Sequence, residues 1–268
     1  MPRAIVLRAA GTNADVELCR AFELAGASVD LEHLGHVVRE PGMLARYDLV
    51  AFAGGFSFGD DVASGRIFAA RVRHGLWDAM RDAAERGCPM IGVCNGFQIL
   101  VQSGLLPGPR AGGGWAREAV VQDRVALCDN VVPRYHDTWA RVEFVEGSAC
   151  VWTRDIDRAA PRETLMLPCA HGEGRFTCRS PEVLRELEDA GQVAIRYVDN
   201  FNGSEGAVAG ICDASGRILG LMPHPERYLD WNRHPFFTRL DAATRTGPTP
   251  GLRMFMSAVE AASRVGAA

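Results

Sequence analysis

The sequence predicts an α/β fold in which a mostly parallel sheet is covered by helices on both faces. Through the first half of the chain, short apolar runs alternate with segments whose apolar residues have helical spacing. One apolar run, 89–93, is followed at once by Cys94 and then by a helix-like segment. This strand–turn–helix arrangement is typical of a nucleophile elbow. Of the 268 residues, 47% are hydrophobic, which suffices for a full core without a disulfide or a metal.

In the first half, strands and helices are expected to alternate along the chain. The expected strands are 4–8, 28–31, 48–53 and 89–93, and the expected helices are 16–24 and 67–85. Gly26 and Gly87 follow these two helices, as glycine does at helix C-termini. Repeated strand–helix units of this kind predict parallel pairing of the strands.

The second half is predicted to continue the sheet and to end in a helix. Strands are expected at 139–145, 150–153, 164–167, 193–197, 207–212 and 217–221, with residues 213–216 joining the last two as a hairpin. The Gly- and Pro-rich segment 106–114 predicts a loop, 227–250 predicts a surface insertion, and 252–262 predicts a closing helix. Without repeats or low-complexity tracts, the chain is predicted to form a single domain over residues 1–268.

Charge and composition exclude several classes of function. The net charge is -4 and the pI is near 6.0, with no basic run, so a nucleic-acid partner is not expected. No apolar run approaches the length of a membrane span, and the N-terminal residues lack the pattern of a signal peptide, so a cytoplasmic protein is expected. The eight cysteines show no Cys-x-x-Cys spacing, which argues against structural zinc.

Cys94 is the cysteine with a setting for chemistry. Gly92 and Gly96 stand two residues before and two residues after it, and a sharp turn between strand and helix needs such small neighbours. The positive end of the following helix would face the sulfur and favour the thiolate, the form that attacks. The other seven cysteines are expected to be free thiols that act as small hydrophobes.

A nucleophilic cysteine needs a base, and the base needs an orienting group. His224 and Glu226, in the run Met222-Pro223-His224-Pro225-Glu226, supply both. In an extended chain residues i and i+2 point the same way, and the two prolines favour an extended backbone. This segment is expected to leave the strand 217–221 at the carboxyl edge of the sheet, where open α/β folds keep their sites.

Two further segments are candidates for substrate binding. Gly54, Gly55 and Phe56 directly follow the strand 48–53, and glycines at a strand end let backbone N–H groups approach a ligand. One of these N–H groups, with that of Asn95, could form an oxyanion hole. His171 lies in a Gly-spaced polar segment after the strand 164–167; a ligand-binding histidine and a structural loop histidine are both consistent with this setting.

Taken together, these segments resemble the class I, or triad, glutamine amidotransferases. The run Gly-Val-Cys-Asn-Gly-Phe-Gln at 92–98 is similar to the nucleophile motif of the PurQ family, the glutaminase subunits of phosphoribosylformylglycinamidine synthase. Further stretches resemble the same family in its order along the chain: 54–60, Ala-His-Gly-Glu-Gly-Arg at 170–175, Asn-Gly-Ser at 202–204 and Met-Pro-His-Pro-Glu-Arg at 222–227. The resemblance covers most of the chain and implies a three-layer, flavodoxin-like α/β fold with a nucleophile elbow.

The resemblance also implies a reaction. Cys94 would attack the side-chain amide of glutamine, His224 would act as base and later as acid, and Glu226 would orient the imidazole. Gln98 would help to hold the substrate, and the backbone groups of residues 55, 56 and 95 would hold the oxyanion. Ammonia would then pass to an ATP-dependent PurL-type synthetase subunit, which converts formylglycinamide ribonucleotide to the amidine in purine biosynthesis.

The same resemblance implies partners and cofactors. A PurS-type small subunit usually completes the complex, and ATP and Mg²⁺ belong to the synthetase, so neither a cofactor nor a metal is implied for this chain. The chain departs from the family at Ala10 and Ala14, where the family shows Pro and Cys, and at Asp61-Val62-Ala63. Extra residues around 110–134 and 228–250 put the docking surface, but not the triad, in question.

Other functions remain open at this point. A class I glutaminase that serves another synthetase shares the triad, but the His-Gly-Glu-Gly segment argues against it. A catalytically silent regulatory subunit has no need of Cys94, His224 and Glu226. A cysteine hydrolase or chaperone-like protein on the same scaffold would give no reason for Gln98 or for the Pro-His-Pro-Glu run.

Overall fold

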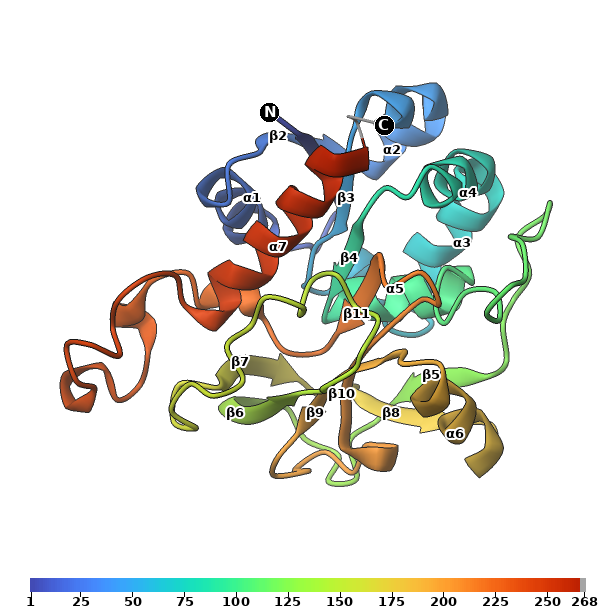
Figure 1. The fold of residues 1–268 in the computed structure, drawn as a ribbon. Helices are drawn as coiled ribbons and strands as arrows, with labels where there is room; N and C mark the ends of the chain where they lie inside the picture. The colour runs from blue at the N-terminus through green and yellow to red at the C-terminus, as the bar shows by residue number, and fades with distance from the viewer. Residues whose placement is uncertain (266–268) are drawn as a thin grey trace.

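The computed structural model describes residues 1–265, and a nine-stranded sheet runs through it (Figure 1). The last three residues of the predicted domain 1–268 lie outside the described residues. The sheet has the order β2-β1-β3-β4-β11-β10-β9-β6-β7. Its strands are β1 (Arg3–Arg8), β2 (Ser28–His33), β3 (Leu49–Phe52), β4 (Met90–Val93), β6 (His136–Phe144), β7 (Met166–His171), β9 (Val193–Tyr197), β10 (Val208–Cys212) and β11 (Ile218–Leu221). A separate antiparallel pair is formed by β5 (Val125–Cys128) and β8 (Arg175–Cys178).

The five adjacent strands β2, β1, β3, β4 and β11 are parallel, as the strand–helix repeats predict. In the middle of the sheet, every residue of β3, β4 and β11 is buried. Such strands are apolar on both faces because helices cover both sides. The remaining neighbours, from β11 through β10, β9 and β6 to β7, pair antiparallel. The sheet is therefore mixed, with a parallel core.

Helices form a layer on each side of the parallel strands (Figure 1). On one side α1 (Asp15–Leu24) packs against α7 (Pro250–Val265), and on the other α3 (Arg66–Gly75) packs against α5 (Asn95–Ser103). The remaining helices are α2 (Leu34–Arg39), α4 (Trp77–Glu85) and α6 (Pro181–Asp189); α2 and α4 contact α3, and α6 contacts β8. Short 3₁₀ segments are η1 (Pro41–Arg46), η2 (Ser57–Asp60), η3 (Glu205–Ala207), η4 (Pro225–Arg227), η5 (Trp231–Arg233) and η6 (Phe237–Arg239).

The predicted helix 67–85 is wrong in one respect, because the structure breaks it into α3 and α4. Leu76 has φ -130° and ψ -2°, outside the helical region, and it directly follows Gly75. Glycine is a poor helix former, and a Cβ at Gly75 would lie 2.8 Å from Val38 Cγ1. The break lets α4 turn away and pack against η1. Apolar periodicity continues through the break, so the sequence pattern conceals it.

The predicted strand 150–153 is also wrong. These residues form turns, and their apolar character comes from burial of Trp152 instead. The Trp152 indole N–H donates to the carbonyl of Arg217 at 2.9 Å, and its ring packs edge-on against Phe22 of α1 and Phe255 of α7. A short apolar run cannot be distinguished from a buried turn by periodicity alone.

The segment predicted as a surface insertion, 227–250, is only partly at the surface. Tyr228 is fully buried and its ring packs edge-on against Trp139 of β6, with ring centroids 5.0 Å apart. His234 is buried as well, with Nε2 2.7 Å from the carbonyl oxygen of Glu163. The first part of the segment is therefore anchored in the core. Sequence reasoning also missed α2, α6 and the β5–β8 pair.

Strand direction explains why the candidate residues can meet. β3, β4, β7 and β11 all run the same way through the sheet, so their carboxyl ends lie at one edge. β7 is the last strand in the order of the sheet. It nevertheless lies beside the segment that follows β11, since the His224 N–H donates to the carbonyl of Pro168 in β7 at 2.7 Å. Segments after four strands thus converge on one place.

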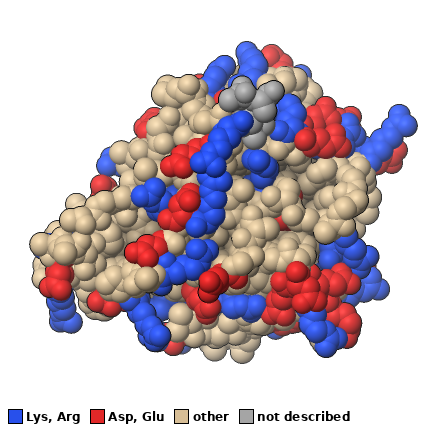
Figure 2. Space-filling view, in the orientation of Figure 1, with Lys and Arg blue, Asp and Glu red and all other residues tan. Residues whose placement is uncertain are grey.

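The surface carries both charges close together. On the face in Figure 2, Arg side chains lie beside Asp and Glu side chains across the whole outline. Within the described part of the chain, no helix combines the length and the apolarity that a membrane crossing requires.

Candidate active site

Cys94 lies at the turn between β4 and α5, in a backbone conformation that ordinary residues avoid. Its φ of 54° and ψ of -109° are non-helical, and α5 begins at the next residue. A Cβ at Gly92 would overlap the carbonyl of Gly96, and a Cβ at Gly96 would overlap the carbonyl of Phe52 in β3. Only glycine fits at either position. The two glycines singled out in the sequence are therefore the residues that allow the elbow to form.

His224 and Glu226 form a buried pair beside this elbow. His224 Nδ1 and Glu226 Oε1 are 2.6 Å apart, and the two side chains are only 2% and 0% exposed. Their predicted proximity is confirmed, but an extended backbone is not its full cause. The chain does not stay extended through this run, because residues 225–227 form the 3₁₀ segment η4.

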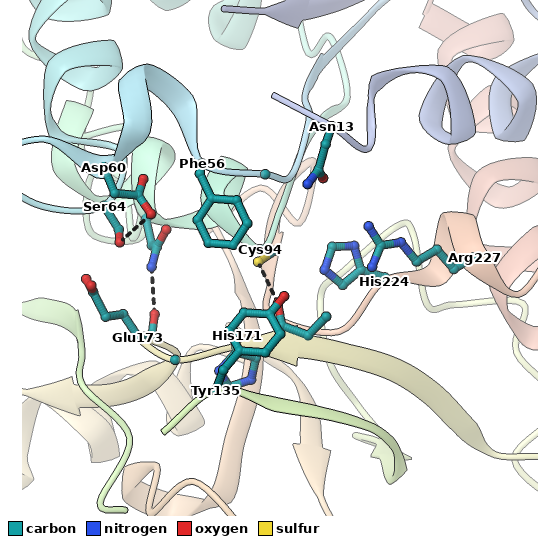
Figure 3. A pocket seen from close by; sticks show the side chains of 14 residues that line it. Asn13, Phe56, Asp60, Ser64, Cys94, Tyr135, His171, Glu173, His224 and Arg227 are labelled. Carbon is teal, nitrogen blue, oxygen red and sulfur yellow. Dashed lines mark hydrogen bonds between the residues drawn. The ribbon is translucent and has the colours of Figure 1, made fainter. Parts of the chain in front are cut away.

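The imidazole of His224 faces Cys94 in the pocket (Figure 3). Its Nε2 is buried without a hydrogen-bond partner among the described residues, and a Cβ at Gly54 would lie 3.0 Å from its Cε1. Burial lowers the pKa of His224, but the Glu226 carboxylate and the neighbouring Cys94 outweigh burial and raise this pKa to about 9. His224 therefore holds a proton at neutral pH, next to the sulfur.

The backbone N–H groups of Gly55, Phe56 and Asn95 are the candidates for holding an oxyanion beside Cys94. Phe56 donates its N–H to the carbonyl of Gly11 at 2.9 Å, so this group is already engaged, contrary to the expectation that it would hold an oxyanion. Among the described residues, no backbone hydrogen bond uses the N–H of Gly55 or of Asn95. These two N–H groups can take the oxyanion role. Gly54, for its part, makes room for the His224 ring and accepts hydrogen bonds from Asn13 and Ala14.

Gln98 borders the pocket, but its side-chain amide is bonded to the protein at both ends. Its Nε2 donates to the carbonyl of Glu173 at 2.6 Å, and its Oε1 accepts from Asn95 Nδ2 at 2.9 Å. Asn95 in turn accepts from the Ser57 hydroxyl at 2.6 Å and donates to Asp60 at 3.3 Å. Gln98 therefore ties α5 to the segment after β7, which is a positioning arrangement.

His171 ends β7 and is buried against the pocket. Both of its ring nitrogens lack hydrogen-bond partners among the described residues. Burial, together with the nearby imidazoles of His224 and His136, lowers the pKa of His171 to about 3. His171 is therefore neutral throughout the physiological range, with one ring nitrogen able to accept a hydrogen bond in the cavity.

Two buried asparagines hold the segment that follows His171. Asn130 donates to the carbonyl of His171 at 3.1 Å and accepts from the N–H of Gly174 at 3.3 Å. Asn202 donates to the carbonyl of Gly174 at 2.9 Å. The stretch 202–204 therefore supports the pocket rather than lining it. Asn130 has no sequence pattern around it that could have identified it.

The pocket has a volume of about 230 Å³ (Figure 3). The predicted site residues that line it are Gly55, Phe56, Cys94, Gln98, His171 and His224, whereas Gly54, Asn95 and Glu226 lie outside its lining. Its lining includes side chains that sequence reasoning did not select as site residues: Asn13, Asp60, Ser64, Tyr135, Glu173 and Arg227. Asp60 and Glu173 stand within motif segments of the sequence, so their positions in those segments were the available signal. Asn13 stands between Ala10 and Ala14, in a stretch that was compared with the family, whereas Tyr135 had no such signal. Within the described part of the chain, no cluster of three His, Cys, Asp or Glu side chains could hold a metal ion.

Comparison with known proteins agrees with this arrangement. The family model for the CobB/CobQ-like glutamine amidotransferase domain matches residues 1–260. Phosphoribosylformylglycinamidine synthase subunit PurQ from Dehalococcoides mccartyi is 38% identical over 270 residues, which is 98% of each chain. The same subunit from Methanococcus maripaludis is 34% identical over 280 residues, 97% of each chain.

Among solved structures, a chain of PurLQS from Thermotoga maritima is similar throughout. Its TM-score is 0.70 at 28% identity, with 97% of this chain and 98% of that chain covered. A putative GMP synthase protein from Thermoplasma acidophilum, 10% identical with a TM-score of 0.55 over 98% of this chain and 96% of that chain, shares the fold. The fold, the matched length and the identity lead to one conclusion: the chain belongs to the CobB/CobQ-like glutamine amidotransferases and, among these, to the PurQ family.

Proposed function

We propose that this chain hydrolyses glutamine at Cys94 as the glutaminase subunit of phosphoribosylformylglycinamidine synthase, a step of purine biosynthesis. The relatives that bear this subunit's name match this chain over nearly their whole length. The observation that carries the chemistry is the protonated, Glu226-bound imidazole of His224 facing the sulfur at the start of α5. The same relatives argue against a glutaminase that serves a different synthetase, and an intact buried triad argues against a silent subunit.

In the first half of the reaction the Cys94 thiolate attacks the side-chain carbonyl carbon of glutamine. The oxygen takes the negative charge and is held by the N–H groups of Gly55 and Asn95. The C–N bond then breaks as His224 gives its proton to the leaving nitrogen, which departs as ammonia. Because His224 already holds a proton at neutral pH, its acid role comes first.

In the second half water hydrolyses the thioester. Neutral His224 takes a proton from water, the hydroxide adds to the thioester carbon, and the C–S bond breaks to release glutamate and the thiolate. Glu226 keeps the imidazole aligned through the 2.6 Å contact. His224 ends the cycle protonated, as it began.

The ammonia goes to a PurL-type synthetase subunit, in a complex that includes a PurS-type subunit, as in the PurLQS assembly from Thermotoga maritima. We assign no cofactor to this chain and place ATP and Mg²⁺ with the synthetase. A cytoplasmic location is part of the same proposal. The described residues support the glutaminase part of this proposal, since Cys94 and His224 line one pocket of about 230 Å³ and Glu226 contacts the His224 imidazole at 2.6 Å.

Replacement of Cys94 by Ala tests the nucleophile. We expect glutamate release from glutamine, measured with the synthetase complex assembled, to fall to the background rate, because no thioester can form. Cys128→Ser, at a half-buried cysteine outside the pocket, is the matched control and retains activity. The glutamine mimic diazo-oxo-norleucine is expected to label Cys94 alone among the eight cysteines. Glutamine hydrolysis by Cys94→Ala would rule out this assignment.

A further inference from the structure

We propose that Asp60 and Glu173 bind the α-ammonium group of glutamine and so select an amino acid over a simple amide. This inference rests on the proposed glutaminase function and names the part of the pocket that recognises the substrate's charge. It concerns two side chains that take no part in the bond-breaking steps above.

Asp60, Ser64 and Glu173 gather on one side of Cys94, whereas His224 and Arg227 lie on the other (Figure 3). Glutamine bound with its side-chain amide at the sulfur would extend its α-carbon away from the reacting centre. The side of the cavity away from His224 is left for that part of the substrate, and the carboxylates line it.

The charges of Asp60 and Glu173 also favour a cationic ligand between them. Both carboxylates are half-buried, and among residues 1–265 neither forms an ion pair with an Arg or His side chain. Burial raises the pKa of Asp60, and the negative charge of Glu173 raises it further against the hydrogen bonds from Ser64 and Asn95. Two like charges without a cation repel each other. An ammonium group placed between them relieves this repulsion and forms charge-assisted hydrogen bonds to both.

The backbone around Asp60 is strained. Phe58, Asp60 and Val62 all have positive φ, of 57°, 55° and 74°, within five residues. Residues with a side chain avoid this region, and a β-branched one such as Val62 most of all. Such residues persist only where the surroundings hold them. Here the hydrogen bonds to Ser64 and Asn95 hold the Asp60 carboxylate toward the cavity.

The same network positions Glu173. Gln98 donates to the Glu173 carbonyl at 2.6 Å and accepts from Asn95, which also donates to Asp60. One chain of hydrogen bonds from α5 thus fixes both acidic segments, although they lie more than 100 residues apart in sequence. The role that the family resemblance gives to Gln98, holding the substrate, becomes indirect: Gln98 is a positioning residue for Glu173.

An independent observation shows that the cavity is built for a polar ligand. His171 is 3% exposed and His224 is 2% exposed, and both line the same pocket. Three of their ring nitrogens, both of His171 and Nε2 of His224, are buried without any hydrogen-bond partner among the described residues. Buried polar atoms are nearly always paired. A bound amide substrate supplies the missing donors and acceptors.

The test compares glutamine with glutaramate, which has the same side-chain amide and carboxylate but no α-amino group. For Asp60→Asn and Glu173→Gln, we expect the ratio of kcat/KM for glutamine to that for glutaramate to fall about 10- to 100-fold, chiefly through KM for glutamine. Asp61→Asn removes the same charge one residue away, from an exposed side chain outside the pocket, and keeps the wild-type ratio.

A second readout does not depend on turnover. Diazo-oxo-norleucine carries an α-ammonium group, and iodoacetamide does not, but both alkylate an activated thiol. We expect Asp60→Asn and Glu173→Gln to slow labelling of Cys94 by the first reagent at least tenfold more than labelling by the second. Equal slowing of both reagents, or an unchanged substrate ratio, overturns the subsite. Wild-type protein that hydrolyses neither amide in the complex, or an active Cys94→Ala variant, instead overturns the glutaminase function.

Discussion

At the scale of single residues, the triad depends on a charge balance around His224. The imidazole is buried, which by itself disfavours its protonated form, yet the Glu226 carboxylate and Cys94 raise the pKa to about 9 from a usual value near 6.5. In the proposed reaction His224 thus starts as an acid. Hydrogen bonding also decides which candidate oxyanion donors are available. The N–H of Phe56 donates to the carbonyl of Gly11, whereas those of Gly55 and Asn95 make no backbone hydrogen bond among the described residues.

The raised pKa of His224 predicts the pH dependence of both activity and stability. Because the folded pKa lies above the unfolded one, the stabilisation, about 3 kcal/mol, is complete below pH 6.5 and is lost as pH rises through 9. We expect kcat/KM for glutamine to fall above pH about 9, as the proton for the leaving nitrogen is lost. Rate profiles and urea unfolding between pH 6 and 10 measure the two effects.

Glu226→Gln provides the corresponding variant. Without the carboxylate, burial is left to lower the pKa of His224, so the alkaline fall in rate should begin at a lower pH, and the maximal rate should also drop. Glu143→Gln, an exposed acid of β6 far from the pocket, serves as the control. An alkaline limb at the same pH in Glu226→Gln and wild type would contradict the role given to this pair.

At the scale of elements, the elbow is a packing solution shared by β3, β4 and α5. The start of α5 lies so close to β3 that a Cβ at Gly96 would overlap the Phe52 carbonyl, and one at Gly92 would overlap the Gly96 carbonyl. Close approach puts the first N–H groups of α5 beside the sulfur. The glycines are thus structural requirements of the catalytic geometry.

Gly96→Ala tests this close approach. We expect the free energy of unfolding to fall by about 1–3 kcal/mol, because β3 or α5 must shift to admit the methyl group. Gly42→Ala is the matched control: its Cβ would meet nothing within 4 Å, and the change should stay within about 0.5 kcal/mol. Both are measured by urea unfolding. Equal stabilities of the two variants would argue against a tight elbow.

Other elements show where sequence patterns mislead. The helical apolar spacing over 67–85 continues through a break at Leu76, so the pattern predicts one helix where α3 and α4 stand. The apolar run 150–153 predicts a strand, but burial of Trp152 accounts for it. In both cases the pattern reports which residues are buried, and burial does not decide backbone direction.

At the scale of the whole molecule, distant segments close the two helical layers and complete the pocket. Phe22 of α1, Trp152 and Phe255 of α7 form one buried aromatic cluster, with the Phe22 and Phe255 ring centroids 5.2 Å apart. This cluster joins the two ends of the described chain to its middle. β7, the last strand of the sheet, likewise lies beside the segments that follow β4 and β11, through hydrogen bonds from Cys94 and His224.

Phe255→Ala tests how much the closing helix contributes. The ring is fully buried and edge-packed on both sides, so we expect a loss of about 3–5 kcal/mol in unfolding free energy. Met256→Ala, at the next and only half-buried position of α7, should cost clearly less. The comparison is made by denaturant unfolding at one pH. A loss for Phe255→Ala no larger than for Met256→Ala would show that α7 is not tied to the core in this way.

What the sequence determined by itself is local. The elbow residues 92–96 are neighbours along the chain, and so are His224 and Glu226. Short-range turn chemistry therefore shapes the elbow and, separately, pairs the two side chains. The parallel strands follow from apolar runs that both helical layers bury. These features require no knowledge of distant contacts, and for that reason they could be predicted, together with the family resemblance that the motifs carry.

Only the tertiary structure decided which groups are free and which are occupied. The family resemblance implies that Gln98 holds the substrate. In the structure its side-chain nitrogen instead donates to the carbonyl of Glu173, 75 residues away. The N–H of Phe56 donates to the carbonyl of Gly11. Glu173 follows β7, and its negative charge raises the pKa of Asp60 only because the fold places the end of β7 beside the pocket. Hydrogen-bond competition and charge proximity are long-range properties, set by packing, and a linear pattern does not record them.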